Sequence, residues 1–427
     1  MLDDKKVTAI MEAVDEGFDE QMEFTAHLVR FPSVRGQEQT AQDFMAKEMT
    51  TRGLSVDRWK INVEDIKDLP GFSPVDISYE NALNVVGTHR ATRQKGHSLI
   101  LNGHIDVVPT GPLDKWTTPP FEPRTENGLM YGRGAGDMKS GLVSCLFALD
   151  ALKRIGYGPA SDVYVQSVIE EEPTGNGTLA CLQRGYRADA ALIPEPMEGT
   201  LMRAEMGIMW FQVQVHGDPQ HASGGQGSGV NAIEKAFYLV QALKDLERDW
   251  NGLKGEHPEY ISHPYPVRFN LGRIKGGDWT SSVPAWCHFD MRVGFYPGWD
   301  LADVRAKIET CIQKAAHEDD FIKSNIPTIV YNGHQSEGFV LKNADEVEGV
   351  LGKSHKAVFG ERLGEFSIPG ATDGHFFSLY ANTPALVYGP KCISSHGFDE
   401  AVDIESVRKT TQTIALFIAH WCGLETV

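Results

Sequence analysis

Several short apolar segments of this chain run directly into an acidic or imidazole side chain. Residues 98–101 lead into His104, and residues 162–169 lead into three consecutive glutamates. These segments are rich in β-branched residues, which favours strands, and they alternate with helical stretches such as residues 141–155. The alternation predicts an α/β fold in which a central mixed sheet is sandwiched by helices.

The chain begins with two amphipathic segments that we expect to be helices. The first covers residues 8–30, and the second covers residues 38–53 and ends at Gly53. Further helices are expected at residues 344–359 and 404–418, with a buried strand at residues 384–388. All of these elements belong to the predicted larger α/β domain.

Residues 206–333 show a different order of elements. The predicted strands and helices are strand 209–216, helix 231–250, strands 267–274 and 285–295, helix 301–318 and strand 328–331. The order βαββαβ is that of a ferredoxin-like unit, in which two helices cover one face of a four-stranded sheet. We therefore expect this unit to be inserted into a larger domain made of residues 1–205 and 334–427.

Bulk properties agree with two domains and limit the partners. The chain of 427 residues exceeds the roughly 250 to 300 residues at which one core stops growing. Its 40 basic and 58 acidic side chains give a net charge of -18, which disfavours nucleic acid and anionic membranes. No segment has the apolar length of a secretory signal or a membrane span, so a cytoplasmic location is expected. The six cysteines form no Cys-x-x-Cys pair, which indicates reduced core thiols.

The first chemically informative position is His104, which Asp106 follows two residues later. Positions i and i+2 of a strand share a face, so the Asp106 carboxylate could hold the second ring nitrogen of His104 and fix its tautomer. This is the arrangement of a metal ligand with its supporting group. A buried strand-end histidine beside a solvated aspartate is an equally compatible interpretation.

Asp137 lies near the end of a glycine-rich segment, YGRGAGDMKSG at residues 131–141, directly before a predicted helix. The glycines permit close approach, and a carboxylate at the helix start could bridge two metal ions. A dinucleotide-binding loop is the rival interpretation, but the spacing differs from G-x-G-x-x-G. A helix-capping aspartate is compatible with the same residues.

Further carboxylates and a histidine follow other apolar segments. Glu170, Glu171 and Glu172 end one predicted strand, Glu195 follows another, and His396 lies in a loop after a third. Adjacent carboxylates raise one another's pKa unless a positive group lies nearby, which favours a metal ion with one glutamate as ligand and its neighbour as base. An acidic solvated turn is the alternative.

All of these groups should converge, because ligands of open α/β sheets bind beyond the carboxyl ends of the strands. Two histidines and three carboxylates form a nitrogen and oxygen donor set without thiolate. Such a set suits zinc and tolerates cobalt or manganese. The sequence therefore predicts a divalent-metal centre at these side chains: His104, Asp137, Glu172, Glu195 and His396.

The sequence also resembles a known family, the co-catalytic metal amidohydrolases that include acetylornithine deacetylase, succinyl-diaminopimelate desuccinylase, aminoacylase and carboxypeptidase G. The matching segments follow the family's order along nearly the whole chain: GHIDVVP at 103–109, Trp116 with PPF at 119–121, YGRGAGDMKSG at 131–141, EEE at 170–172, PEP at 194–196, HAS at 221–223, GVNAI at 229–233, TDG at 372–374 and the loop around His396.

The resemblance implies two divalent metal ions, zinc being the first choice, that share Asp137 as a bridging ligand. His104 and Glu195 would complete one metal site, and Glu172 and His396 would complete the other.

The resemblance also assigns expected roles to other residues. Glu171 corresponds to the general base, and Asp106 corresponds to the residue behind the metal-binding histidine. The insertion at 206–333 corresponds to a lid and dimerisation domain. His221 corresponds to a histidine that reaches the partner's active site in a homodimer and stabilises the tetrahedral intermediate, and Arg292 corresponds to an arginine that grips a substrate carboxylate.

Two departures from the family leave the substrate open. The chain has Ser281-Ser282 where an asparagine is common, and the loop at residues 224–229 is rich in glycine. We expect hydrolysis of the amide bond of a small N-acyl amino acid-like compound. Cleavage of a dipeptide, a carbamoyl compound or an aromatic amine at the same metals remains an alternative. So do a binding protein of this fold without catalysis and a dinucleotide-dependent oxidoreductase.

Overall fold

A computed structural model describes residues 2–224, 227 and 229–427, so three positions of the glycine-rich loop, 225, 226 and 228, lie outside it. A six-stranded mixed sheet forms the centre of the larger domain. Its strand order is β1 (Ser55–Lys60), β2 (Leu83–His89), β7 (Val163–Val168), β3 (Leu99–His104), β8 (Ala190–Ile193) and β16 (Ala385–Val387). Strands β7, β3, β8 and β16 run parallel, whereas β1 and β2 pair antiparallel. The carboxyl ends of β3, β7 and β8 therefore meet at one edge of the sheet.

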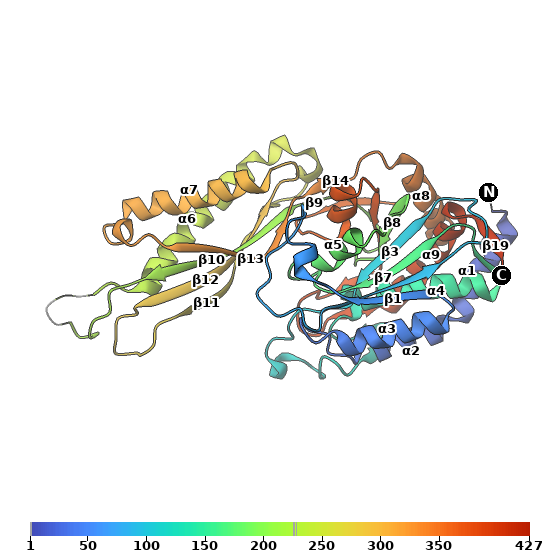
Figure 1. The fold of residues 1–427 in the computed structure, drawn as a ribbon, viewed down its shortest axis with the longest axis horizontal. Helices are drawn as coiled ribbons and strands as arrows, with labels where there is room; N and C mark the ends of the chain where they lie inside the picture. Colours follow the sequence, from blue (N-terminus) through green and yellow to red (C-terminus); the bar gives the residue numbers. More distant parts are fainter. Residues whose placement is uncertain (1, 225–226, 228) are drawn as a thin grey trace.

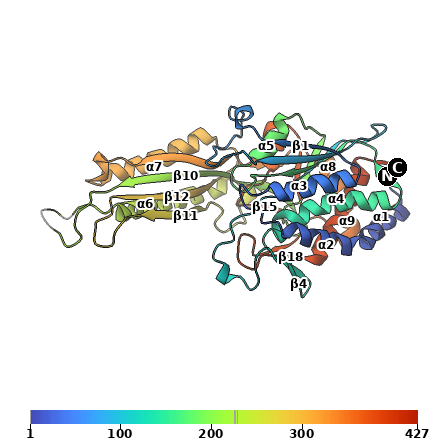
Figure 2. The same ribbon diagram turned by 60° about the horizontal axis from the view of Figure 1, so that its bottom comes forward.

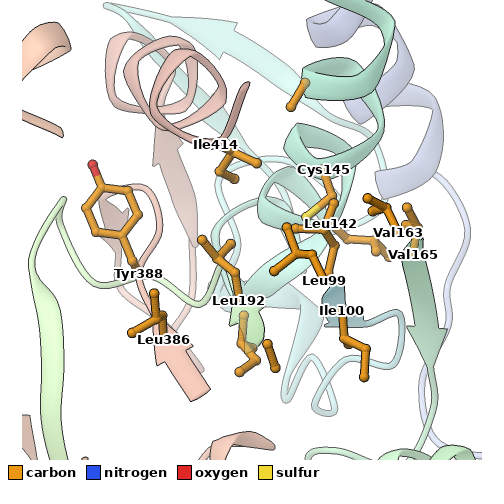
Figure 3. Packing of buried hydrophobic residues seen from close by; sticks show 14 of the residues in the cluster. Leu99, Ile100, Leu142, Cys145, Val163, Val165, Leu192, Leu386, Tyr388 and Ile414 are labelled. Carbon is orange, nitrogen blue, oxygen red and sulfur yellow. The ribbon is translucent and has the colours of Figure 1, made fainter. Parts of the chain in front are cut away.

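Helices cover this sheet, which confirms the predicted α/β architecture. The helices of the larger domain are α1 (Asp4–Glu16), α2 (Phe18–Val29), α3 (Gln39–Thr51), α4 (Ser140–Arg154), α5 (Asn176–Gln183), α8 (Asp345–Phe359) and α9 (Ile404–Trp421). Figure 2 shows α1 to α4 and α9 gathered on one side. In Figure 3, Leu142 and Cys145 of α4 lie against Leu99 and Val165 of the sheet. Val86 packs in a separate cluster with Cys181 of α5.

The predicted single helix at residues 8–30 is wrong, because the chain breaks at Gly17 into α1 and α2. Arg154 packs against this break, and its guanidinium donates to the Ala13 carbonyl at 2.9 Å near the end of α1. A Cβ at Gly17 would lie 2.4 Å from Arg154 Nη1, so no other residue fits there without moving that side chain. Glycine also has a low helix propensity.

The inserted unit consists of a second sheet with two helices on one face. Its antiparallel strands lie in the order β11 (Phe269–Gly276), β12 (Trp286–Phe295), β10 (Gly207–His216) and β13 (Thr328–Ser336), and its helices are α6 (Ala232–Gly252) and α7 (Leu301–Glu318). Burial alternates along β10, so Phe211 and Val213 pack beneath the helices while Gln212 faces the open side. Figure 1 shows this unit extending from the larger domain, away from both chain termini. Strand β13 continues past the expected boundary at residue 333.

Three smaller sheets join distant parts of the chain. They are β14 (Phe339–Val340), β9 (Leu201–Glu205) and β15 (Glu365–Ile368); β17 (Cys392–Ile393), β18 (Ala401–Asp403), β5 (Leu129–Tyr131) and β4 (Arg124–Glu126); and β19 (Leu424–Thr426) with β6 (Tyr157–Pro159). The sheet that contains β5 and β18 connects the segment before Asp137 with the loop that contains His396. No helix of the described residues is apolar over the length that a membrane span requires.

Candidate metal centre

Two groups of potential metal ligands share the carboxylate of Asp137. His104 Nε2 lies 3.3 Å from Asp137 Oδ1 and 3.5 Å from Glu195 Oε1. On the other side, His396 Nε2 lies 3.4 Å from Asp137 Oδ2 and 3.2 Å from Glu172 Oε2. Within each group the potential donor atoms lie within 4.8 Å of one another. The structure thus brings together all five side chains that the sequence proposes as ligands.

The first ligand group (His104, Asp137 and Glu195) is buried at the edge of the central sheet. His104 is the last residue of β3 and is 1% exposed, and Glu195 comes two residues after β8. The packing around Glu195 is close, because a Cβ on Gly141 at the start of α4 would lie 2.0 Å from the Pro194 carbonyl oxygen. The buried strands therefore hold these two ligands in fixed positions.

The second ligand group (Asp137, Glu172 and His396) includes an exposed loop. His396 lies between β17 and β18, has a φ of +62° and is 54% exposed at its side chain. Burial would lower the pKa of His396, but Glu172 and Asp137 outweigh this effect and raise the pKa to about 11. This shift shows how strongly negative the surroundings are, and such surroundings favour a cation.

Asp137 does not occupy the start of α4. It lies in the segment η3 (Ala135–Lys139), where its own backbone is non-helical, with φ -119° and ψ 97°, and α4 begins at Ser140. The interpretation of Asp137 as a capping residue is therefore wrong. This backbone conformation lets one carboxylate oxygen face each histidine.

Glu171 occupies the space beside the first ligand group. Its Oε2 lies 3.9 Å from His104 Nε2, and burial raises the pKa of its carboxyl group well above the usual value. Burial likewise raises the pKa of Glu195, whose Oε1 has no hydrogen-bond partner among the described residues. Buried carboxyl groups with few donors around them are suited to metal coordination or proton transfer.

The three consecutive glutamates point in different directions, and a positive group lies beside one of them. Glu170 turns away from the centre: Arg35 Nε donates to its Oε1 at 2.5 Å, and the Tyr79 hydroxyl donates to its Oε2 at 2.6 Å. A guanidinium group therefore compensates the charge of Glu170, while Glu171 and Glu172 face the two histidines.

Asp106 supports His104, but not through the predicted contact. His104 Nδ1 lies 2.9 Å from the Asp106 carbonyl oxygen and 3.7 Å from its carboxylate. The strand geometry fails here because β3 ends at His104. The Asp106 carboxylate instead accepts hydrogen bonds from the backbone N–H groups of Glu171, at 3.3 Å, and Glu172, at 3.2 Å. It therefore orients the turn that carries the proposed base and one ligand.

Several buried polar groups meet where β12 and β13 approach the larger domain. Arg292 Nη2 donates to the Pro369 carbonyl at 3.2 Å, and burial lowers the Arg292 pKa to about 10. Among the described residues no carboxylate pairs with Arg292. His334 is 6% exposed, and neither of its ring nitrogens has a hydrogen-bond partner in the described part of the chain. The sequence alone does not single out His334, because no local sequence pattern distinguishes it from a histidine on a surface strand.

His221 lies in the inserted unit, far from the junction at which Arg292 and His334 lie. It belongs to the loop that connects β10 to α6, at the end of the sheet that points away from the larger domain in Figure 1. It forms a β-bridge with Ser282, so the Ser281-Ser282 turn lies beside it. The Ser223 backbone N–H donates to His221 Nδ1 at 3.2 Å, which leaves the ring proton of the neutral imidazole on Nε2.

Comparisons with known proteins agree with this architecture. The sequence model of Peptidase family M20/M25/M40 matches residues 100–420. The N-formyl-4-amino-5-aminomethyl-2-methylpyrimidine deformylase of Bacillus subtilis (strain 168) is 30% identical over 98% of this chain and 99% of its own length. The enzyme of the same name from Halalkalibacterium halodurans is 28% identical over 98% of both chains.

Solved structures share the fold at low sequence identity. The dipeptidase Dug1p from Saccharomyces cerevisiae superimposes with a TM-score of 0.78 at 15% identity, over 97% of this chain and 98% of its own. Human carnosine dipeptidase 1 gives a TM-score of 0.74 at 13% identity, over 97% of this chain and 99% of its own. These two likenesses extend over both the larger domain and the inserted unit.

Proposed function

The chain belongs to Peptidase family M20/M25/M40, a family of metal-dependent hydrolases, and on that premise we propose that it hydrolyses the amide bond of a small N-acyl compound with a free carboxylate. The observation that carries the proposal is Glu171, a buried carboxyl group beside two ligand groups that share Asp137. The family match does not single out any of the enzyme groups that the motifs resemble. The kind of acyl group and the kind of amine in the substrate therefore belong to the proposal and do not follow from the family match.

The donor set fits a pair of divalent ions. His104 and Glu195 would hold one ion, Glu172 and His396 the other, and Asp137 both. The Glu195 Oε1 atom is buried without a hydrogen-bond partner among the described residues, as a ligand atom would be. We propose zinc, with cobalt or manganese as substitutes, because the donors are imidazole and carboxylate groups only. Bound divalent ions supply Lewis acidity, which polarises an amide carbonyl and lowers the pKa of water.

Glu171 performs the proton transfers in this proposal. Its Oε2 accepts the proton of the attacking water and then donates it to the nitrogen of the leaving amine. Asp106 keeps Glu171 in place, because its carboxylate accepts the Glu171 backbone N–H. Burial raises the pKa of Glu171 well above the usual value, in the direction that a group must shift to hold a proton near neutral pH.

The substrate carboxylate would bind Arg292. This guanidinium is partly buried, and the described residues offer it no acidic partner. A buried cation without a counter-ion favours an anionic ligand, and an arginine can bind a carboxylate through two parallel hydrogen bonds. Arg292 projects from β12 at the junction of the two units, where it lies near His334.

A homodimer would supply the remaining group. The inserted unit acts in this proposal as lid and dimerisation domain, and His221 of one protomer reaches the centre of the other. His221 is exposed, and its Nε2 proton is available because Nδ1 accepts from Ser223. A hydrogen bond from that proton would stabilise the oxyanion of the tetrahedral intermediate.

A second candidate is the removal of a formyl group from an amine attached to an aminopyrimidine. The two full-length relatives support it, since both are named as deformylases of such a compound. The two ligand groups and Glu171 would serve this reaction equally well, whereas Arg292 would have no substrate carboxylate to bind.

A substrate panel separates the two candidates. We would incubate the zinc-loaded protein with N-formyl, N-acetyl and N-succinyl amino acids, a dipeptide and an N-formyl aminomethylpyrimidine, and measure the released amine by mass spectrometry. Release from the carboxylate-bearing amides supports the first proposal. Release from the pyrimidine alone assigns the second, and no release from any compound by a protein with two bound ions contradicts both. Glu171→Gln is the inactive control.

A further inference from the structure

A buried carboxylate outside the ligand set contacts the backbone of Asp137. Glu400 is 0% exposed and directly precedes β18. Its Oε1 accepts hydrogen bonds from the backbone N–H groups of Gly136, at 3.0 Å, and Asp137, at 3.1 Å. Glu400 therefore fixes the segment from which the shared ligand projects.

Arg133 links the same carboxylate to the loop of His396. Arg133 Nη1 donates to Glu400 Oε2 at 2.5 Å, and Nη2 donates to the Gly397 carbonyl oxygen at 3.1 Å. The guanidinium is 5.1 Å from the centre of the Trp116 ring, and Arg133 is 1% exposed. One buried ion pair thus connects Asp137 to the residue that follows His396.

The small sheet around this pair brings two distant segments together. Strand β5 leads toward Asp137 and pairs with β18, and the loop between β17 and β18 contains His396. The Gly132 N–H also donates to the Glu400 carbonyl at 2.8 Å. A Cβ on Gly136 would lie 2.2 Å from Cys392 Sγ, so the two segments touch without a gap.

The two ligand groups differ in their dependence on this contact. His104 and Glu195 are held by β3 and β8 of the central sheet. His396 has no strand of that sheet behind it, and its loop is held by the Arg133 hydrogen bond to Gly397 and by the Ser395 hydroxyl, which donates to Asp137 Oδ2 at 2.6 Å. A change in the buried pair should therefore disturb the second ligand group more than the first, which contains Asp137 but no residue of the β17–β18 loop.

We propose that Glu400 and Arg133 are positioning residues that hold His396 at the correct distance from Asp137 and so set the metal affinity of the second ligand group. Neither residue lies among the proposed metal ligands. The inference rests on the proposed function only in requiring that divalent ions occupy the two groups. Groups that orient metal ligands commonly change metal affinity by about 10-fold to 100-fold when they are replaced.

The test is metal binding by Glu400→Gln. An amide at this position must turn an NH2 group toward either Arg133 or the two backbone N–H groups, so one side of the contact is lost. We expect two zinc ions per wild-type chain, and in the variant a second ion weakened about 10-fold to 100-fold, more than the first. Zinc content is measured after dialysis at set free-zinc concentrations, and cobalt titrations follow the absorption band of each site.

Glu405→Gln is the matched control, because Glu405 pairs with Arg408 on the surface of α9. Its zinc content and cobalt spectrum should equal those of the wild type. The variant Glu400→Gln leaves the Arg133 charge buried and unpaired, which threatens folding. A double variant, Glu400→Gln with Arg133→Met, removes both charges and should fold while showing the same weakened second ion.

Four results would overturn the proposal: two ions bound with wild-type affinities in a folded variant, equal weakening of both ions, failure of both variants to fold, or one ion in the wild type. Folding is followed by circular dichroism. Because these titrations measure metal and not turnover, a wild type that cleaved none of the proposed amides would leave the result for Glu400 standing.

Discussion

Glu171 and Glu172 are neighbours in the chain, yet their carboxylates face different histidines. Glu171 Oε2 lies 3.9 Å from His104 Nε2, whereas Glu172 Oε2 lies 3.2 Å from His396 Nε2. Asp106 makes this possible, because its carboxylate accepts the backbone N–H of both glutamates and fixes the turn between them. Two adjacent carboxylates can therefore have different roles, one as base and one as ligand.

Replacement of each glutamate by glutamine should separate these roles. Glu171→Gln should keep two metal ions and lower kcat by about 10²-fold to 10⁴-fold, the usual contribution of a general base. Glu172→Gln should instead lose an ion. Metal content and turnover are measured on the same samples. Loss of metal in Glu171→Gln would assign that residue to the ligand set.

Removal of the metal ions should destabilise the protein. Without cations, Asp137, Glu172 and Glu195 bring negative charge close together. A ligand present at 100 times its Kd stabilises the folded state by about 2.7 kcal/mol, so a chelator should lower Tm and zinc should restore it. The measurement is a thermal melt before and after chelation. A Tm that does not change would contradict metal binding by the folded chain.

Arg292→Met should raise KM for amides that carry a carboxylate by about 10-fold to 100-fold, since a charged hydrogen bond contributes about 1.5–3 kcal/mol. KM for an N-formyl amine without a carboxylate should not change. Arg305→Met is the control, because Arg305 lies on α7 and therefore on the helix-covered side of the sheet, opposite the open face. Equal effects on both substrate types would argue against a carboxylate contact.

His334 should make the stability depend on pH. Burial lowers its pKa to about 3, with His375 and Arg292 acting in the same direction. An unfolded histidine has a pKa of about 6.5, so below that pH the unfolded chain binds one proton more than the folded chain. The free energy of unfolding should therefore fall as pH falls, by up to about 1.4 kcal/mol per pH unit.

The measurement for His334 is urea unfolding between pH 7.5 and 5.5, for the wild type and for His334→Gln. The variant lacks this titration, so its stability should fall less steeply with decreasing pH. Identical slopes for the two proteins would show that His334 becomes protonated in the folded state.

Mixed dimers test the proposed role of His221. His221→Ala and Glu171→Gln should each be nearly inactive alone. A dimer with one chain of each kind contains one complete site, in which Glu171 comes from the first chain and His221 from the second. Mixing followed by exchange of subunits should therefore restore up to a quarter of the wild-type activity. Continued inactivity in confirmed mixed dimers would place the two residues in the same protomer's site.

Much of the fold could be predicted because its signals are local. The helix at residues 301–318 and the strand at 285–295 follow from apolar periodicity, which one segment displays by itself, and α7 and β12 lie there. The break at Gly17 escaped prediction although glycine has a low helix propensity, which is the local signal that could have shown it; the packing of Arg154 against Gly17 is visible only in the structure.

The sequence by itself determined which side chains are available as metal ligands and which strand each one follows. An apolar run that ends near His104 or Glu195 can be recognised without knowledge of any residue far away in the chain. Only the tertiary structure decided the direction of Glu170, the use of the Asp106 carbonyl and the contact of Glu400 with Asp137. These relationships depend on sheet register and on pairs far apart in the chain. Side-chain periodicity contains no information about them, since it reports only which face of its own element a residue occupies.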